Sequence, residues 1–384
     1  MAHKEILERL KQDIETLQEP SYGYIKAGLP RFPALFGRDS CIVSWQLIDY
    51  KPEIARNTIE ILSKLQGNKI DPTSEEEPGK ILHEWHPNPK EYKFVPWPLP
   101  YYGSVDSTPL FIYLCHLYYE KTTDTVWLES HWQYIERALK WCEKYGDFDG
   151  DFMLEYERKR STGLTHQGWK DSLLDHLGIK SPVELVEVQG YYYAALMAGS
   201  DLALLLKNTS LSETLRARAI YLKNRFLDEF WLEDEKYFAF ALEESIKPVP
   251  KITSNPGHLL FTGILDDAKD KIESVVKRLF QDDMWTPFGI RTHSAKDPAF
   301  NPMSYHLGSI WPHDNWIISQ GLKRYGYKKE YFKIKQALID AFENLGKIPE
   351  LYTAYDGKIQ EIPIACYPQA WASGALLNFL LEDE

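Results

Sequence analysis

VEVQGYYY, residues 186–193, stands at the start of a helix predicted over 188–206 in which almost every side chain is apolar. A helix that is apolar all round is enclosed by other helices, whereas a helix at a protein surface keeps one polar face. Similar polar-aromatic segments that contain Gly or Pro stand ahead of other apolar helices. They are FPALFGRDS (32–40), YYGSVDSTP (101–109), SNPGHLLFTG (254–263), SYHLGSIWPHDN (304–315) and ACYPQAWASG (365–374).

Between each apolar helix and the next of these segments, the sequence predicts a second helix with a more charged face. Helical periodicity is clear over 54–65, 110–119, 127–145, 188–206, 213–232, 268–280, 310–325, 330–345 and 370–381. Such pairs can close into a ring with apolar helices inside and amphipathic helices outside. We therefore predict an all-α fold, an (α/α)₆ barrel whose unusual loops gather at one end around a central pocket.

Strand-like patterns are short, and none belongs to a βαβ series. Alternating stretches at 152–156 and 237–242 predict small β-hairpins at the rim of the barrel. This pattern argues against a parallel sheet. No Ser/Gly-rich linker divides the chain, so we predict one domain over 1–384 with a short N-terminal helix at 1–19.

The composition narrows the range of partners. The net charge is −12 and there is no run of basic residues, so neither nucleic acid nor an anionic membrane is an expected partner. The first 20 residues form an amphipathic pattern without the apolar core of a secretory signal, and the four cysteines form no CxxC pair. These features predict a cytoplasmic protein with reduced thiols, and they make no prediction of an oligomeric state.

Aromatic residues make up 14% of the chain, with 12 Trp and 24 Tyr. Trp and Tyr combine an apolar ring face with a polar tip, a combination that suits surfaces holding sugar rings, although large helical cores also contain many aromatics. A small carbohydrate is the expected partner.

Glycosidic hydrolysis requires one carboxyl that protonates the leaving oxygen and a second that activates water or attacks the sugar. Asp171 in THQGWKDS has an adjacent Trp that would raise its pKa and favour the protonated form of a general acid. The alternative is that Asp171 caps the helix predicted over the following SLLDHL. Glu350 in GKIPELYTAY follows a Pro-bounded turn, and its alternatives are helix capping or a solvated charge at the rim.

Arg38 and Asp39 in the GRDS segment stand side by side just before an apolar helix. Such a pair can bind vicinal sugar hydroxyls as donor and acceptor, because the guanidinium fork fixes the geometry. A buried ion pair between the same two residues is the competing interpretation.

Three other motifs contain residue types used in metal or nucleophile chemistry. HEWH (83–86) lacks the HExxH spacing of a zinc site. DFDGD (147–151) resembles the start of a calcium loop, but its Gly and the following Glu fall at the wrong offsets for an EF-hand, which favours a tight turn. WPHDN (311–315) is not accompanied by a nucleophile elbow and predicts a pocket wall that binds hydroxyls. We expect no metal and no organic cofactor.

Eight motifs in order together resemble the amylo-α-1,6-glucosidase family, the catalytic region of glycogen debranching enzymes. They are GLPRFPALFGRDS, YYGSVDSTPLF, DGDFMLEYER, HQGWKDS, VEVQGYYYAA, NPMSYHLGSIWPHDN, IPELY and YPQAWASGA, between residues 28 and 381. The resemblance implies an (α/α)₆ barrel related to glucoamylases, trehalases and processing α-glucosidases, with inversion of anomeric configuration.

The resemblance also implies roles for individual residues. Asp171 matches the general acid of the family, Glu350 its general base, and Arg38 with Asp39 the pair that holds the terminal sugar. The other substrate-binding residues predicted in these motifs are Asp106, Trp169, Lys170, Gln189, His306, Trp311, His313 and Asp314.

The function expected from the sequence is an exo-acting α-glucosidase with α-1,6-linked glucose as the leading linkage. The alternatives are a hydrolase of another small α-glucoside (trehalose, glucosylglycerate or a maltooligosaccharide), a sugar epimerase that would use His258, His306 and His313 as bases, and a non-catalytic sugar-binding protein.

Overall fold

A computed structural model describes residues 3–90, 92, 95–172, 177–244 and 246–382. Its helices are α1 (His3–Leu17), α2 (Gly37–Gln46), α3 (Pro52–Lys64), α4 (Ser107–Thr122), α5 (Thr125–Lys144), α6 (Val186–Leu205), α7 (Thr209–Glu229), the 3₁₀ turn η2 (Asn255–His258), α8 (Leu259–Thr262), α9 (Lys269–Leu279), α10 (Pro312–Arg324), α11 (Lys328–Leu345) and α12 (Ala370–Leu381).

The strands are two to four residues long and form small antiparallel sheets. They are β1 (Leu35–Phe36), β2 (Glu84–Trp85), β3 (Glu184–Leu185), β4 (Trp231–Leu232), β5 (Tyr237–Phe238), β6 (Ala241–Glu243), β7 (Lys247–Val249), β8 (Trp285–Thr286), β9 (Gly289–Ile290), β10 (Tyr352–Tyr355) and β11 (Lys358–Glu361). The sheets pair β1 with β2, β4 with β5, β8 with β9, and β10 with β11, and one sheet has the order β3-β6-β7.

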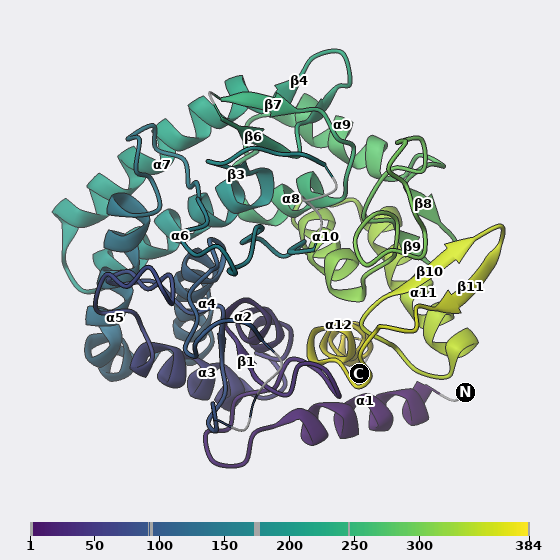
Figure 1. Ribbon diagram of the computed structural model, residues 1–384, viewed down its shortest axis with the longest axis horizontal. Coiled ribbons are helices and arrows are strands. Elements are labelled where there is room, and N and C mark those ends of the chain that lie inside the picture. The colour runs from purple at the N-terminus through teal and green to yellow at the C-terminus, as the bar shows by residue number, and fades with distance from the viewer. Residues whose placement is uncertain (1–2, 91, 93–94, 173–176, 245, 383–384) are drawn as a thin grey trace.

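The even-numbered helices form a closed inner ring. In order around the ring, α2 packs on α4, α4 on α6, α6 on α8, α8 on α10, α10 on α12, and α12 returns to α2. Figure 1 shows this ring from one end, with the helices arranged around a central space. Nearly every residue of α6, α10 and α12 is buried, as expected for helices with neighbours on all sides.

The odd-numbered helices form the outer layer and complete the (α/α)₆ barrel. α3, α5, α7 and α11 each pack on the inner helix that precedes them, and α9 packs on η2. The N-terminal helix α1 packs on α12 and supplies the remaining outer helix, with Ile6, Leu7, Leu10 and Ile14 on its buried face. Helices from the two ends of the chain thus close the barrel.

The fourth inner helix is short, and the neighbouring helix approaches it very closely. α8 has four residues and continues the 3₁₀ turn η2. A Cβ atom added to Gly321 of α10 would lie 2.2 Å from the Cβ of Leu260 in α8, so only glycine allows this contact. The segment 254–263, expected to be a loop ahead of a helix, is therefore itself this inner helical turn.

Two predicted strands differ from the structure. Residues 152–156 form no strand, because the side chain of Gln189 donates to the carbonyl of Leu154 and accepts from its N–H, both at 2.8 Å. The stretch 237–242 is divided between β5 and β6, which pair with different partners. The helix predicted over 213–232 ends at Glu229, because Trp231–Leu232 pair with β5. Within the described residues, no helix is long and apolar enough to cross a membrane.

Candidate active site

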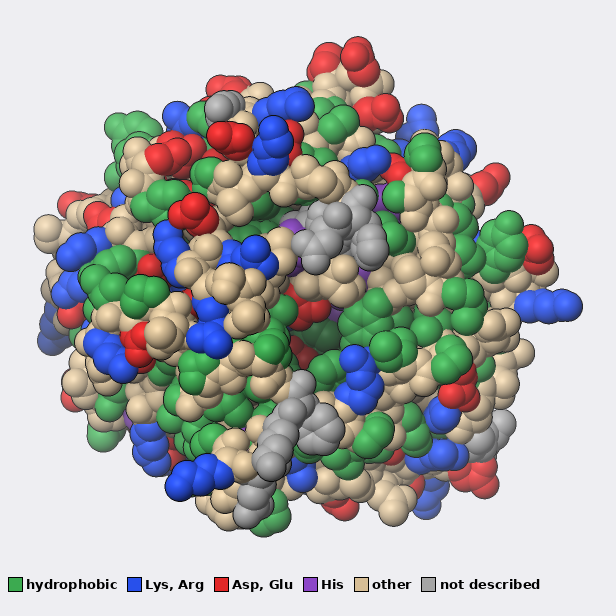
Figure 2. All heavy atoms as spheres, viewed as in Figure 1, with side chains coloured by type: hydrophobic (Ala, Val, Ile, Leu, Met, Phe, Trp, Pro, Cys, Tyr) green, Lys and Arg blue, Asp and Glu red, His purple; other side chains and the backbone are tan. Residues whose placement is uncertain are grey.

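The segments that precede the inner helices line a cavity of about 450 Å³ at one end of the barrel. Figure 2 shows a hollow near the centre of this face with acidic side chains inside it. Six of the predicted site residues line this cavity: Arg38, Asp39, Trp169, Asp171, Trp311 and Glu350. The two carboxyls assigned to catalysis, 179 residues apart in the sequence, therefore face one space.

Asp171 is in an environment that favours its protonated form. Its side chain is 28% exposed, and its Oδ2 lies 3.9 Å from Nη1 of Arg38. Burial raises the pKa of Asp171 to about 6, Arg38 opposes this rise, and the negative charges of Asp106 and Glu350 add to it. The helix predicted after Asp171 includes residues 173–176, which lie outside the described residues. A carboxyl with this pKa retains a protonated fraction near neutral pH, as a general acid requires.

Glu350 is 2% exposed, and three donors surround its carboxylate. Tyr305 Oη donates to Oε1 at 2.5 Å, Gln369 Nε2 to Oε1 at 3.2 Å, and the N–H of Cys366 to Oε2 at 2.9 Å. Burial raises the pKa of Glu350, while these hydrogen bonds act in the opposite direction by stabilising the ionised form. The N–H of Glu350 also donates to the carbonyl of Cys366 at 3.0 Å, which fixes the loop that presents the carboxylate.

Arg38 pairs with Asp106 and not with its neighbour Asp39. Its Nε donates to Asp106 Oδ2 at 2.6 Å, and both residues are buried. Ser104 donates to the other oxygen of Asp106 at 2.7 Å. Nη2 of Arg38 is buried with no hydrogen-bond partner among the described residues, and a sugar hydroxyl would satisfy this donor. Asp106 therefore lies behind the cavity wall and holds Arg38 in place.

Asp39, in the first turn of α2, lines the cavity without sharing that ion pair. Burial raises its pKa to about 7, and Arg38 opposes this rise. Its side chain is available as an acceptor, or in the protonated form as a donor, to a ligand in the cavity.

Aromatic rings form the base of the cavity. Trp169, Trp311 and Trp371 line it. Beneath them, the ring of His313 stacks on Trp371 with centroids 3.7 Å apart, and His306 stacks on Trp311 at 4.9 Å. The two histidines are buried, outside the cavity lining, and support the tryptophans.

Three further predicted binding residues lie in the surrounding structure. Lys170 is buried and donates to the carbonyl of Thr292 at 2.6 Å. Asp314 forms a buried 2.7 Å contact with His258, so these two residues are paired with each other. Gln189 binds the backbone of Leu154 as described above. None of these three predicted residues lines the cavity.

The positions of the three histidines argue against the sugar epimerase alternative, which would use them as bases. His258, His306 and His313 are all buried and none of the three lines the cavity. Burial also lowers the pKa of His306 and His313 well below the usual range, which leaves both rings neutral.

Several residues that line the cavity were not predicted from the sequence. His83 and Glu84 belong to the HEWH motif, whose pattern was compared only with that of a zinc site. Glu84 in β2 accepts from Tyr92 Oη at 2.7 Å and Trp97 Nε1 at 3.1 Å, and burial raises its pKa to about 7. The signal in the sequence was an acidic residue among aromatics, the same signal that identified Asp171.

Arg31 is a further lining residue that the sequence did not indicate. Its Nη1 donates to the carbonyl of Ile364 at 3.0 Å, and its guanidinium lies 5.9 Å from the ring centroid of Tyr305. Tyr305 is the donor to Glu350, so Arg31 places a positive charge on the side of the cavity where Glu350 lies.

Two carboxyls in one cavity, one favouring the protonated form and one held by donors, at the end of an (α/α)₆ barrel identify a glycoside hydrolase. The model of the mannosylglycerate hydrolase MGH1-like glycoside hydrolase domain matches residues 128–372, and the chain belongs to this family. The resemblance to amylo-α-1,6-glucosidases thus indicated the right fold and enzyme class, while the family that matches is a different one.

Individual relatives agree with this assignment. Mannosylglycerate hydrolases MGH1 and MGH2 of Selaginella moellendorffii are each 30% identical over 109 residues, 28% of this chain. The aligned region spans only 22% of the length of these relatives. The GH63 mannosylglycerate hydrolase from Thermus thermophilus has a similar fold. Compared with this chain, its complex with glucose has a TM-score of 0.73, and its complex with Tris and D-glycerate has a TM-score of 0.70. Both show 15% identity and cover 98% of this chain and 100% of the other.

Proposed function

We propose that this protein hydrolyses a small α-glycoside of a hydroxy acid, of the mannosylglycerate or glucosylglycerate type, with inversion at the anomeric carbon. The observation that carries the proposal is that Asp171 and Glu350 line one cavity, and that three hydrogen-bond donors surround only the carboxylate of Glu350. The names of the family and of its relatives support the glycerate aglycone, and one solved relative binds D-glycerate.

The proposed reaction divides the chemistry between the two carboxyls. Asp171 donates its proton to the glycosidic oxygen as the bond to the sugar breaks. Glu350 removes a proton from a water that attacks the anomeric carbon from the opposite face. The donors from Tyr305, Gln369 and Cys366 favour the ionised form of Glu350 that this transfer requires.

Sugar binding in this scheme uses the polar wall and the aromatic base of the cavity. The unpaired Nη2 of Arg38 and the carboxyl of Asp39 are placed to bind hydroxyls of the sugar. Stacking of the sugar on an indole ring, from Trp169 or Trp371, would hold its apolar face. A site of this kind rejects an analogue that lacks the bound hydroxyl, because its buried polar groups are left unpaired.

Recognition of an anionic aglycone is assigned to Arg31. Among the described residues that line the cavity, Arg31 and Arg38 are the cationic ones, and Arg38 is already paired with Asp106. A guanidinium binds a carboxylate through two parallel hydrogen bonds, which a neutral aglycone cannot offer. This charge favours a glycerate glycoside over a neutral α-1,6-linked disaccharide.

The deciding experiment is release of free sugar from a panel of mannosylglycerate, glucosylglycerate, isomaltose, trehalose and maltose, with Glu350→Gln as the inactive control. We expect a glycerate glycoside to give the highest kcat/KM, and proton NMR to show the inverted β-anomer as the first product. If isomaltose is the best substrate, the α-1,6-glucosidase interpretation is correct and the glycerate proposal is wrong.

Arg31 is tested with matched pairs of substrates. The glycerate glycoside and its neutral glycerol counterpart differ only in the carboxylate. Arg31→Met should lower kcat/KM for the glycerate glycoside by about tenfold to a hundredfold, in line with about 1.5–3 kcal/mol for a hydrogen bond to a charged group. Activity on the neutral glycoside should change little. An equal loss on both substrates would show that Arg31 acts by supporting Tyr305 and Glu350.

A further inference from the structure

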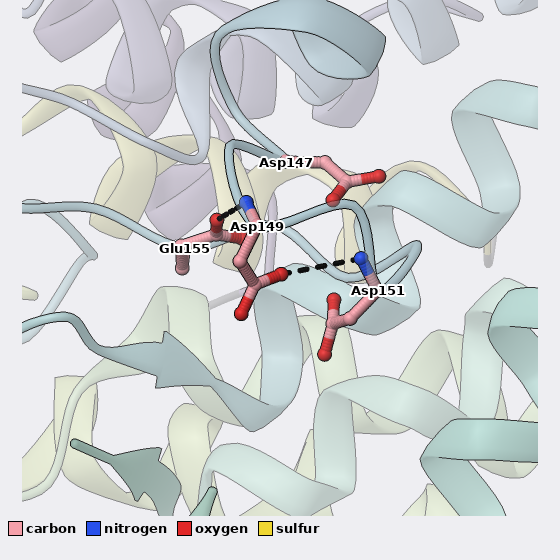
Figure 3. Close-up of side chains that lie close together, drawn as sticks. All are labelled: Asp147, Asp149, Asp151 and Glu155. Carbon is pink, nitrogen blue, oxygen red and sulfur yellow. Dashed lines mark hydrogen bonds between the residues drawn. The ribbon is translucent and has the colours of Figure 1, made fainter. Parts of the chain in front are cut away.

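A group of acidic side chains outside the catalytic cavity follows α5. Asp147, Asp149, Asp151 and Glu155 each offer one carboxylate oxygen, and these four oxygens all lie within 4.8 Å of one another. In Figure 3 the four side chains come from one tight loop and surround a small common space. The loop is held by its own hydrogen bonds: Asp147 accepts from the N–H of Gly150, and Asp149 from the N–H of Asp151.

Two buried carboxylate oxygens at this loop have no partner among the described residues. Glu155 is 3% exposed, and while its Oε1 accepts from the N–H groups of Phe148 and Asp149, its Oε2 is buried and unpaired. Glu184 of β3 is 7% exposed, and its Oε2 is likewise buried and unpaired. An ionised oxygen in this state carries a large desolvation cost unless a cation or a donor meets it.

Glu184 of β3 lies next to the same group, although it is far along the chain from the loop. Tyr156 and Val183 exchange two backbone hydrogen bonds of 3.1 Å and form an antiparallel bridge. In this register the residue before Tyr156 is opposite the residue after Val183, so Glu155 is opposite Glu184. A fifth carboxyl from a distant segment is therefore placed beside Glu155 of the loop.

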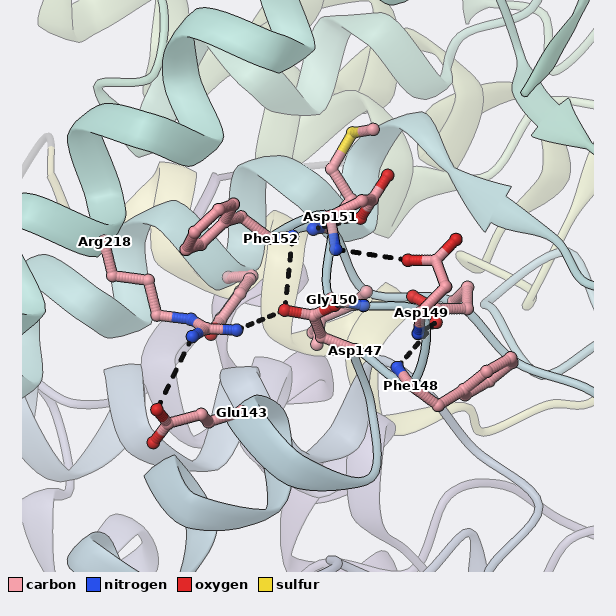
Figure 4. A network of polar contacts seen from close by, with 12 residues as sticks. Glu143, Asp147, Phe148, Asp149, Gly150, Asp151, Phe152 and Arg218 are labelled. Carbon is pink, nitrogen blue, oxygen red and sulfur yellow. Dashed lines mark hydrogen bonds and ion pairs between the residues drawn. The ribbon is translucent and has the colours of Figure 1, made fainter. Parts of the chain in front are cut away.

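The positive charges nearby compensate only part of this group. Arg218 of α7 forms an ion pair with Asp147, as Figure 4 shows, and Arg225 reaches Asp151 at 3.3 Å. Arg225 is shared with Glu229, which lies closer at 2.6 Å. Asp149, Glu155 and Glu184 have no ion pair with a Lys, Arg or His of the described chain.

We propose that the loop of Asp147, Asp149, Asp151 and Glu155, together with Glu184, binds one divalent cation of the calcium type. Carboxylate oxygens without His or Cys are the ligands of hard cations, and a flexible set of five carboxylates suits Ca²⁺ better than the small, strictly octahedral Mg²⁺. Counted from Asp147, the loop has its Gly at the fourth position and its Glu at the ninth, whereas an EF-hand has them at the sixth and twelfth, which is why the sequence pattern alone did not indicate the site.

The role of the cation is structural. Leu154, next to Glu155, is held by Gln189 of α6, and Tyr156 is paired with Val183. The segment that continues from Tyr156 carries Trp169 and Asp171 to the cavity. A cation bound between the loop and Glu184 would fix both ends of the segment that runs from Tyr156 to Val183. It should therefore raise the stability of the protein without taking part in hydrolysis.

The test measures binding and stability on the full chain after EDTA treatment and removal of the chelator. Calcium is titrated by calorimetry, Tb³⁺ luminescence reports direct occupancy, and thermal unfolding is compared in EDTA, in CaCl₂ and in KCl of equal ionic strength. We expect one saturable site and a higher Tm in CaCl₂ than in KCl.

Two isosteric variants and one control locate the site. Asp149→Asn, at an exposed position that remains an acceptor, should weaken calcium binding by about tenfold or more, because affinity follows the number of ligand charges. Glu184→Gln takes one carboxylate ligand from the site and should abolish most of the calcium-dependent increase in Tm. Glu157→Gln, exposed and two residues beyond the loop, should behave like the wild type.

The proposal is wrong if the wild type shows no saturable binding, or if calcium and potassium raise the Tm equally. It is also wrong if Asp149→Asn and Glu184→Gln bind calcium as tightly as Glu157→Gln does. These results are independent of the substrate and of catalytic activity.

Discussion

Replacement of Asp171 by Asn most directly tests the proposal that Asp171 is the general acid and Glu350 the general base. Burial and the nearby charges raise the pKa of Asp171 from its ordinary value of 3.8 to about 6. That change corresponds to about 3 kcal/mol in favour of the protonated form, and at pH 7 it makes the acid form about 150-fold more abundant. Asn keeps the shape of the side chain and cannot donate a proton to the glycosidic oxygen.

The expected loss depends on the leaving group. A positioned general acid contributes about 10²- to 10⁴-fold, so Asp171→Asn should lower kcat on a glycerate glycoside or a disaccharide by that amount. From an α-glycosyl fluoride the fluoride ion departs with little protonation. The kcat of Asp171→Asn on this substrate should therefore fall by less than about tenfold. In the wild type, kcat/KM on the natural type of substrate should fall as the pH rises through about 6, because the protonated form of Asp171 is then lost.

The assay compares wild type and variant on both substrates between pH 4 and pH 9, with unfolding temperatures measured for each protein. Equal losses on fluoride and disaccharide would refute the assignment of Asp171 as the acid. A lower Tm with normal activity would instead identify Asp171 as a helix cap, which is worth about 1 kcal/mol. If kcat/KM of Asp171→Asn still falls above about pH 6 as it does in the wild type, the titrating group is not Asp171.

Four further outcomes follow from the structure. Glu350→Gln should reduce hydrolysis of the fluoride and the glycerate glycoside to a similar extent, because water must be deprotonated in both, and a fluoride rate near wild type would contradict its role as base. Asp39→Asn should lower kcat/KM steeply while the Tm stays within a few degrees, whereas unfolding with normal specific activity would mark a structural residue. Gln189→Leu should destabilise the fold by about 1–3 kcal/mol, because it leaves the N–H and C=O of Leu154 unpaired, and denaturant unfolding would detect it. Exhaustive EDTA treatment should leave kcat unchanged at temperatures well below unfolding, and a loss of kcat restored by Ca²⁺ or Zn²⁺ would show that the reaction itself needs a metal.

The two carboxyls proposed for catalysis could be singled out from the sequence because their signals are local. The Trp two residues before Asp171 and the Pro immediately before Glu350 mark each carboxyl within a few residues. The linkage could not be predicted in this way. In the proposed function the choice of substrate depends on Arg31, which lies in the segment GLPRFPALFGRDS, but its position beside Tyr305 is seen only in the folded structure.

Several predicted binding residues lie outside the cavity for a related reason. Polar residues at the start of inner helices, such as Asp314 and Gln189, have the composition of a binding loop. Their side chains instead satisfy buried partners, His258 and the backbone of Leu154, that come from other parts of the chain. Burial makes such pairing obligatory, and sequence alone does not show which partner is within reach.

The sequence by itself determined the alternation of apolar and amphipathic helices, and with it the (α/α)₆ barrel and the class of enzyme, because helical periodicity and local motifs are properties of neighbouring residues. Only the tertiary structure decided that α12 closes the ring on α2, that Arg38 pairs with Asp106, and that Tyr156 and Val183 form the bridge that brings Glu184 beside Glu155. Each of these contacts joins residues far apart in the chain. Their energies depend on distance and burial, which exist only once the barrel has closed.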